Sequence, residues 1–139
     1  MPAELQRVRQ ILQDNRVVAV LGAHVNVSKP AYYVPQYLFD QGYTIVPVNP
    51  GYVGETLFEH PVAASLAELE QPIDIVDVFR RSEAVPAHLD DILAMNPLPK
   101  VVWLQSGIRN DEVAAKLREA GIEVIQNRCM LADHRNLML

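Results

Sequence analysis

The chain has 139 residues, half of them hydrophobic, and its 12 Lys and Arg against 17 Asp and Glu give a formal net charge of -5. This length suits one domain with a buried core, so we expect a single domain over residues 1–139. The acidic balance argues against a nucleic-acid surface, no apolar run has membrane-spanning length, and the single cysteine excludes an internal disulfide. We therefore expect a cytoplasmic protein with no nucleic-acid or membrane partner.

Strands and helices alternate along the chain. An amphipathic helix is predicted over about 4–15, followed by a core over about 17–134. Apolar runs predict the main strands, which are Val17–Leu21, Tyr43–Val48, Ile73–Phe79, Val101–Leu104 and Ile122–Ile125. Capping residues and glycines predict the remaining helices, at about 31–41, 85–95 and 111–120. This order predicts an α/β, Rossmann-like single domain with a mostly parallel sheet of about five strands and helices on both faces.

Three segments are less regular. Pro35 removes a hydrogen bond from the second helix, which therefore starts close to Pro35 or bends there. A short extended piece is predicted at Thr56–Phe58, and Ser65 with Glu68 predicts a capped helical turn. The tail Leu137-Met138-Leu139 either supports contacts in a homo-oligomer or frays.

The stretch after the first strand has the chemistry of an anion site. Gly22 follows the strand directly and lets the backbone turn sharply. Asn26 and Ser28 can hydrogen-bond backbone amides, and Lys29 with Pro30 opens a helix. Free N–H groups at such a helix start favour a phosphate or another anion.

Basic side chains follow most of the predicted strands. In an open parallel sheet the ligand binds outside the carboxyl ends of the strands. The residues placed there are His24, Lys29, Arg80, Arg81, Arg109 and Arg128, against the acids Glu55, Glu83 and Asp111. The sequence therefore predicts a positive rim that suits a ligand with several phosphates, the alternative being ordinary solvent-exposed loop residues.

Two common nucleotide motifs are missing. A G-x-G-x-x-G fingerprint with a later acid would indicate a dinucleotide, but only Gly22 is present and the second strand ends in Asn49-Pro50. No P-loop motif occurs either. The four histidines show no metal-ligand spacing, so no metal site is expected.

Five motifs in order carry a resemblance to a known family. They are Val20-Leu21-Gly22 with Asn26-x-Ser28-Lys29-Pro30, Val46-Pro47-Val48-Asn49-Pro50, Ile75 to Glu83, Val102 to Ile108 and Asn127-Arg128-Cys129. From Val17 to His134 the chain resembles the small stand-alone CoA-binding proteins, whose domain is similar to the CoA-binding domain of the succinyl-CoA synthetase α subunit. Ligase activity is not implied, because the phosphohistidine domain and the partner subunit of that enzyme exceed this length.

The resemblance implies a domain that binds CoA or acyl-CoA at the strand ends, with no evident catalytic residues. The loop after Gly22 would lie near the phosphates, and the other segments would line the nucleotide and the pantetheine. The implied binding residues are Gly22, Ala23, His24, Asn26, Ser28, Lys29, Asn49, Pro50, Phe79, Arg80, Ser82, Val85, Gln105, Ser106 and Gly107. The alternatives are an oxidoreductase that binds NAD(P) through a degenerate loop, and a regulatory module without ligand that binds a protein partner.

Three buried or reactive side chains are open to two interpretations each. Cys129 is either a small core residue or a thiol that meets the CoA thiol in a mixed disulfide. Asp77 is either catalytic or a buried carboxylate that accepts hydrogen bonds from nearby loop amides. Trp103 packs in the core or contacts the ligand through its neighbours.

Overall fold

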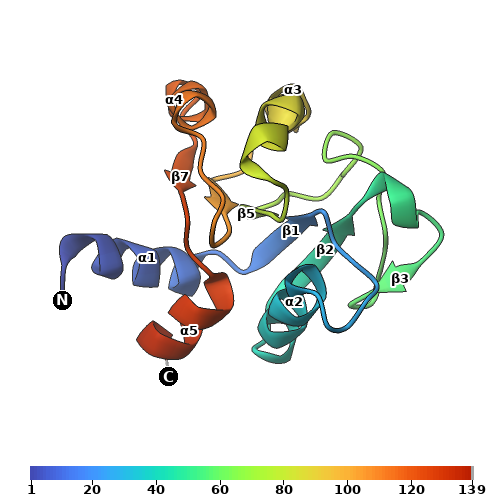
Figure 1. The fold of residues 1–139 in the computed structure, drawn as a ribbon, viewed down its shortest axis with the longest axis horizontal. Coiled ribbons are helices and arrows are strands. Elements are labelled where there is room, and N and C mark those ends of the chain that lie inside the picture. Colours follow the sequence, from blue (N-terminus) through green and yellow to red (C-terminus); the bar gives the residue numbers. More distant parts are fainter. Residues whose placement is uncertain (139) are drawn as a thin grey trace.

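The centre of the structure is a parallel sheet of five strands (Figure 1). The computed structural model describes residues 1–138, and Leu139 lies outside the described part. In spatial order the strands are β2 (Thr44–Val48), β1 (Val17–Leu21), β5 (Ile75–Val78), β6 (Val101–Leu104) and β7 (Glu123–Ile125). Their nearly continuous apolar sequences suit strands buried on both faces. The predicted α/β fold with a mostly parallel sheet is confirmed.

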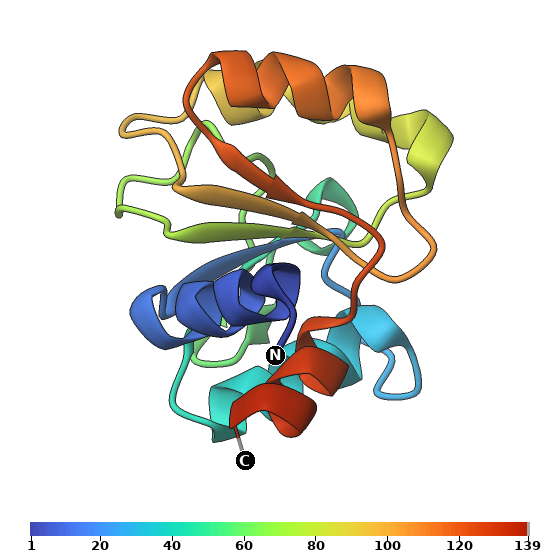
Figure 2. The same cartoon turned by 90° about the vertical axis from the view of Figure 1, so that its left-hand side faces the viewer.

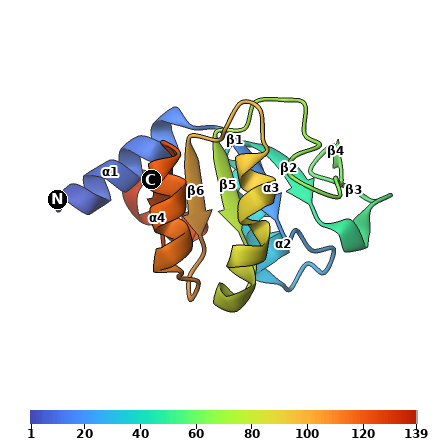
Figure 3. The same cartoon turned by 90° about the horizontal axis from the view of Figure 1, so that it is seen from above.

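Helices cover both faces of this sheet (Figure 2). One face carries α1 (Ala3–Asp14), α2 (Pro30–Asp40) and α5 (Met130–Met138). The other carries the 3-10 helix η2 (Ser82–His88), α3 (Leu89–Leu93) and α4 (Asp111–Glu119), with α3 and α4 side by side above β5 and β6 (Figure 3). A separate apolar cluster fills each interface, as two-sided burial of a parallel sheet requires. No helix in residues 1–138 is long and apolar enough to cross a membrane.

The order of the strands reverses between β1 and β5. From β1 the chain goes to β2 on one side and then crosses to β5 on the other. The loops that leave β1 and β5 therefore diverge at the carboxyl edge of the sheet, which is where such folds bind ligands. Gly22 and Phe79 are the first residues beyond these two strands.

Short elements extend the β2 side of the sheet. They are the 3-10 helix η1 (Pro50–Tyr52) and the antiparallel pair β3 (Thr56–Leu57) and β4 (His60–Pro61), so the predicted extended piece is a strand. The turn predicted at Ser65 is capped by a different residue from the predicted one. Asp91 of α3 accepts the amides of Leu66 and Ala67 at 2.8 and 2.9 Å, so a carboxylate distant in sequence does what the sequence assigned to Ser65.

The helix predicted at 85–95 divides into η2 and α3. Pro86 has no N–H to donate to the carbonyl of Ser82, so a regular α-helix cannot form there. The third strand is shorter than predicted, although the amides of Asp74 and Phe79 still donate to β1 at the carbonyls of Val17 and Leu21. Strand ends commonly differ by such amounts.

The C-terminal helix α5 is the element that the sequence did not predict. It packs against α1 and α2, and its His134 lies 2.9 Å from the hydroxyl of Tyr37 through Nδ1. Burial, and then the positive Arg16, lower the pKa of His134. Leu137 and Met138 pack against the same core cluster, so the prediction that the tail frays is wrong for them, while Leu139 lies outside the described residues.

Candidate ligand-binding site

A pocket of about 680 Å³ opens at the carboxyl ends of β1, β5 and β6, beside the start of α2. Its volume lies within the usual range for small-molecule sites. The binding residues implied by the sequence that line it are Gly22, His24, Lys29, Asn49, Phe79, Arg80, Ser82, Gln105, Ser106 and Gly107. Residues from distant parts of the chain thus meet at the edge where the strand order reverses.

Other implied residues do not line the pocket. Val85 is 2% exposed and packs in the core on the face of the sheet that α3 and α4 cover, because η2 turns it inward. Ala23, Asn26, Ser28 and Pro50 also lie outside the lining, in the loops that support it. The lining residues absent from the implied set are Pro30, Ala31, Tyr33, Val34, Arg81, Glu83, Ile108 and Cys129. Four of these belong to the first turns of α2. The helix start predicted at Lys29-Pro30 was the signal that could have placed them at the pocket.

Gly22 is required where the loops after β1 and β5 approach each other closely. Its φ is +92°, and a Cβ there would lie 2.5 Å from the carbonyl oxygen of Phe79. Any other residue would be strained in this conformation and would push the loop after β5 away. The glycine thus sets how closely the two walls of the pocket approach each other.

The loop after β1 satisfies its own backbone. Asn26 N–H donates to His24 Nδ1 at 2.9 Å, and Asn26 Oδ1 accepts from both the amide and the hydroxyl of Ser28. The amides of Gly22 and Lys29 also donate within the protein. The loop that the resemblance implies near the phosphates therefore uses these amides to hold its own shape.

Pro35 ties this loop to α2. The helix begins at Pro30, so the prediction that it starts close to Pro35 is wrong. Pro35 has no N–H for the carbonyl of Ala31, and this carbonyl accepts instead from the amide of His24 at 3.3 Å. The interior proline therefore provides an acceptor that positions the loop at the mouth of the pocket.

Asn49 connects the loops after β1 and β2. Its Oδ1 accepts from the amide of Gly51 at 2.9 Å, and its Nδ2 donates to the carbonyl of Ala23 at 2.9 Å. Tyr52 reaches the same loop, with its hydroxyl 3.1 Å from His24 Nε2. A dinucleotide site carries an acid at the end of this strand. Here the position holds the neutral Asn49, which adds no negative charge to the pocket.

The basic residues at this edge divide into two groups. Lys29, Arg80 and Arg81 line the pocket together with the acid Glu83. Arg109 and Arg128 do not line it, because their side chains pair with Asp111 at 3.2 Å and with Asp133 at 2.7 Å. The predicted positive rim is therefore narrower than the sequence indicated.

Arg80 has an unsatisfied donor. Its Nε is buried and has no hydrogen-bond partner among the described residues. Burial, and then the positive Arg80, lower the pKa of the nearby His88, which favours the neutral imidazole at neutral pH. Because a buried polar group without a partner is costly, Arg80 is suited to an anionic ligand.

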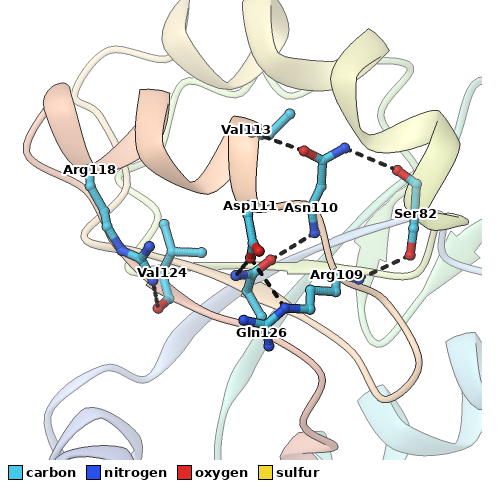
Figure 4. A network of polar contacts seen from close by, with 8 residues as sticks. All are labelled: Ser82, Arg109, Asn110, Asp111, Val113, Arg118, Val124 and Gln126. Atoms are coloured by element: carbon cyan, nitrogen blue, oxygen red, sulfur yellow. Dashed lines mark hydrogen bonds and ion pairs between the residues drawn. The ribbon is translucent and has the colours of Figure 1, made fainter.

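A polar network holds the loop after β6 against η2 (Figure 4). The amide of Arg109 donates to Ser82 Oγ at 3.0 Å, and Asn110 caps α4 by accepting from the amide of Val113 at 3.0 Å. Gln126 joins this network by accepting from the amide of Asn110 at 2.7 Å. The network fixes the two loops that carry Ser82 and Ser106 into the lining of the pocket.

Below the pocket, Asp77 is buried in the middle of the sheet with 0% exposure. Its Oδ1 accepts from Gln105 Nε2 at 2.6 Å, and its Oδ2 has no partner among the described residues. The donor is thus the side-chain amide of Gln105, the first residue of the loop after β6, in line with the interpretation of Asp77 as a buried carboxylate that accepts from a loop amide. Burial raises the pKa of Asp77 to about 8, while the bond from Gln105 acts in the opposite direction.

Cys129 and Trp103 lie next to this pair. Cys129 is half-buried, packs against the core cluster and also lines the pocket. Trp103 is fully buried and donates through Nε1 to the carbonyl of Arg128 at 2.7 Å. Trp103 therefore packs in the core, and it positions the segment that carries Cys129. In residues 1–138 no three His, Cys, Asp or Glu side chains gather in a way that could hold a metal ion.

The fold and the pocket together define a class of protein. A parallel α/β sheet with a pocket at the reversal of its strand order, lined by Lys29, Arg80 and Arg81, is typical of proteins that bind phosphorylated nucleotides. Within that class the chain belongs to the CoA binding domain family, whose model matches residues 16–135. The family relationship predicted from the five sequence motifs is confirmed.

Relatives extend over almost the whole chain. The uncharacterized protein YneT of Bacillus subtilis (strain 168) is 37% identical over 127 residues, which are 91% of each chain. The solved structure of cell-free ID.343 from Thermus thermophilus is 48% identical, has a TM-score of 0.90 and covers 96% of this chain and 98% of its own. A hypothetical protein from Pyrococcus horikoshii OT3 is 30% identical, with a TM-score of 0.89 and coverage of 100% and 97%. These similarities support the family and the fold.

Proposed function

We propose that this protein binds CoA or acyl-CoA in the pocket at the carboxyl ends of β1, β5 and β6. The proposal assigns a binding role and no reaction. It rests on the family and, within the structure, on the buried Nε of Arg80, which lacks a hydrogen-bond partner among the described residues and lies next to Gly22. CoA has a pyrophosphate and a ribose 3′-phosphate, so its oxygens supply the acceptor that this donor lacks.

The remaining lining fits the rest of the molecule. Lys29 and Arg81 join Arg80 as the positively charged part of the lining, while Gln105 and Gly107 after β6 and Cys129 after β7 form an uncharged part. The first part suits the phosphates, and the second suits the uncharged pantetheine arm with its amides and thiol. A pocket with one charged and one neutral part matches a ligand with the same division.

Calorimetric titration tests the proposal. We expect CoA to bind, dephospho-CoA to bind more weakly because it lacks the 3′-phosphate, and NAD to bind hardly at all. Equal affinity for CoA and NAD would favour the dinucleotide alternative. Binding of neither ligand would overturn the proposal and favour a module that serves a protein partner.

A matched pair of arginine variants locates the phosphates. Arg80→Ala removes the unpartnered donor, and we expect it to weaken CoA binding by about ten- to a hundredfold, since hydrogen bonds to charged groups contribute ~1.5–3 kcal/mol. Arg109→Ala is the control, because Arg109 pairs with Asp111 and does not line the pocket. Equal affinities of the two variants would place the phosphates elsewhere.

A further inference from the structure

Asp77 and Gln105 are joined by a hydrogen bond, so the protonation of one side chain limits the orientation of the other. Asp77 lies in β5 between Val20 of β1 and Trp103 of β6, in a sheet layer that has no other polar side chain next to it in register. Gln105 is 4% exposed, lines the pocket and donates through Nε2 to Asp77 Oδ1 at 2.6 Å. The structure gives its carboxamide no other hydrogen bond among the described residues. The oxygen of this carboxamide is therefore free to accept from a ligand.

The protonation state of Asp77 decides which end of the Gln105 carboxamide can face the pocket. An ionised carboxylate only accepts hydrogen bonds, so Gln105 must turn its NH₂ group toward Asp77 and its oxygen toward the pocket. A protonated carboxyl can donate as well, so the carboxamide can also turn round and present its NH₂ group to the pocket. The second oxygen of Asp77 has no partner to favour either state.

The surroundings of Asp77 supply no opposing charge. Arg80 and Cys129 line the same pocket, and His24 lies in the loop after β1. On the segment before α5 the guanidinium of Arg128 is held by Asp133, and on α5 His134 is held by Tyr37. Burial dominates the raised pKa of Asp77, and no charged side chain contributes to it. The protonation state of Asp77 therefore changes near pH 8.

We propose that Asp77 is a positioning residue that, in its ionised form, fixes the Gln105 carboxamide with its oxygen toward the pocket, where it accepts a hydrogen bond from an amide N–H of the pantetheine arm. The inference rests on the proposed CoA binding and goes beyond it by giving a buried residue outside the pocket a role in ligand specificity. It explains why a carboxyl with an unpartnered oxygen is placed directly below a lining side chain.

The test measures affinity from pH 7 to pH 9 with desulfo-CoA, in which hydrogen replaces the thiol so that the ligand thiol cannot titrate. In the wild-type protein we expect affinity to rise about three- to tenfold as pH passes through 8, because ionised Asp77 then holds Gln105 in the accepting orientation. Asp77→Asn does not titrate and should show no such rise. Gln105→Met, which keeps the length of the side chain but has no amide, should bind weakly at every pH.

Adenosine 3′,5′-bisphosphate is the matched control ligand, because it has the adenosine, the 3′-phosphate and the first 5′-phosphate of CoA without the pantetheine arm. Its affinity should change little over this pH range and should be the same in the wild type and in Asp77→Asn. The same pH dependence for desulfo-CoA in the wild type and in Asp77→Asn would overturn the inference and leave CoA binding intact. Failure of the wild type to bind either ligand would overturn the proposed function itself.

Discussion

Two aspartates at β5 have opposite surroundings. Asp74 lies before the amino end of the strand, where its Oδ2 accepts from the amides of Arg16 and Val17 at 3.1 and 3.0 Å. Its Oδ1 lies 3.4 Å from Nζ of Lys100. Asp77 lies inside the strand toward the carboxyl end, is fully buried and has one oxygen without a partner among the described residues.

The difference separates a carboxylate that stabilises the fold from one that serves a site. Every acceptor of Asp74 that the structure describes is matched by a donor, so its two oxygens are satisfied by contacts that hold the fold together. Asp77 has a single donor, Gln105, among the described residues, and its burial disfavours the ionised form. Unmatched polar atoms gather at the carboxyl edge, since the buried Nε of Arg80 lies there as well.

The largest expected effect is the pH dependence of stability caused by Asp77. Burial raises the pKa of the folded carboxyl to about 8, whereas the unfolded one loses its proton near the ordinary pKa of 3.8. Between these values the native state binds more protons, so stability falls as pH rises, by about 1 kcal/mol per pH unit. Asp77→Asn should remove this fall in urea unfolding from pH 5 to pH 9. Identical pH profiles would show that Asp77 is not buried as described.

A glycine substitution tests how closely the walls of the pocket approach. Gly22→Ala should cost about 3 kcal/mol of stability, because it adds a Cβ next to the carbonyl of Phe79 to the strain of a positive φ. Gly121→Ala is the control, since its φ is +88° but nothing lies within 4 Å of the added Cβ. Urea unfolding should show a clearly smaller loss for the control, and equal losses would exclude the close contact at Gly22.

Removal of the Asp74 carboxylate tests the opposite edge. Asp74→Ala leaves the amides of Arg16 and Val17 without their acceptor, so we expect stability to fall by about 2 kcal/mol. Ligand affinity should be unchanged, because Asp74 lies at the far end of the strand from the pocket. Glu112→Ala, which breaks only an exposed pair with Lys116, should cost less than about 0.5 kcal/mol in the same unfolding measurement.

The smallest expected effect concerns Lys29. Its side chain lines the pocket at the start of α2, and one exposed contact with a phosphate contributes ~0.3–1 kcal/mol. Lys29→Ala should therefore weaken CoA binding about two- to fivefold by titration, and the loss should shrink at high salt. Lys116→Ala on the surface of α4 should have no effect, and an equal loss there would indicate a nonspecific influence of charge.

Local sequence predicted most of the fold. The strands β1 and β6 have the predicted limits, because a run of buried apolar residues before a glycine or a polar turn carries its own boundaries. The helix α5 could not be predicted in this way. Its buried Asp133 and His134 are polar, and their burial is stabilised by Arg128 just before the helix and by Tyr37, which α2 brings near.

Much of the candidate site could also be predicted, since Gly22, Lys29 and Arg80 follow strands and strand ends of a parallel sheet lie at one edge. Which basic side chains form ion pairs within the protein was not predictable. Arg109 and Arg128 follow strands too, but neighbouring carboxylates turn them away from the pocket. The amides of Asn26 and Ser28 likewise donate to side chains of their own loop, which depends on a complete loop conformation.

The sequence alone determined the alternation of strands and helices, the edge at which a ligand binds and the family, because hydrophobic runs, caps and short motifs are local properties. Only the tertiary structure decided which polar groups at that edge are satisfied. The bond between Asp77 and Gln105, and the one between His24 and the carbonyl that Pro35 leaves free, join residues from different elements. Such bonds depend on burial and on the packing of neighbouring strands and helices, which no single stretch of the chain specifies.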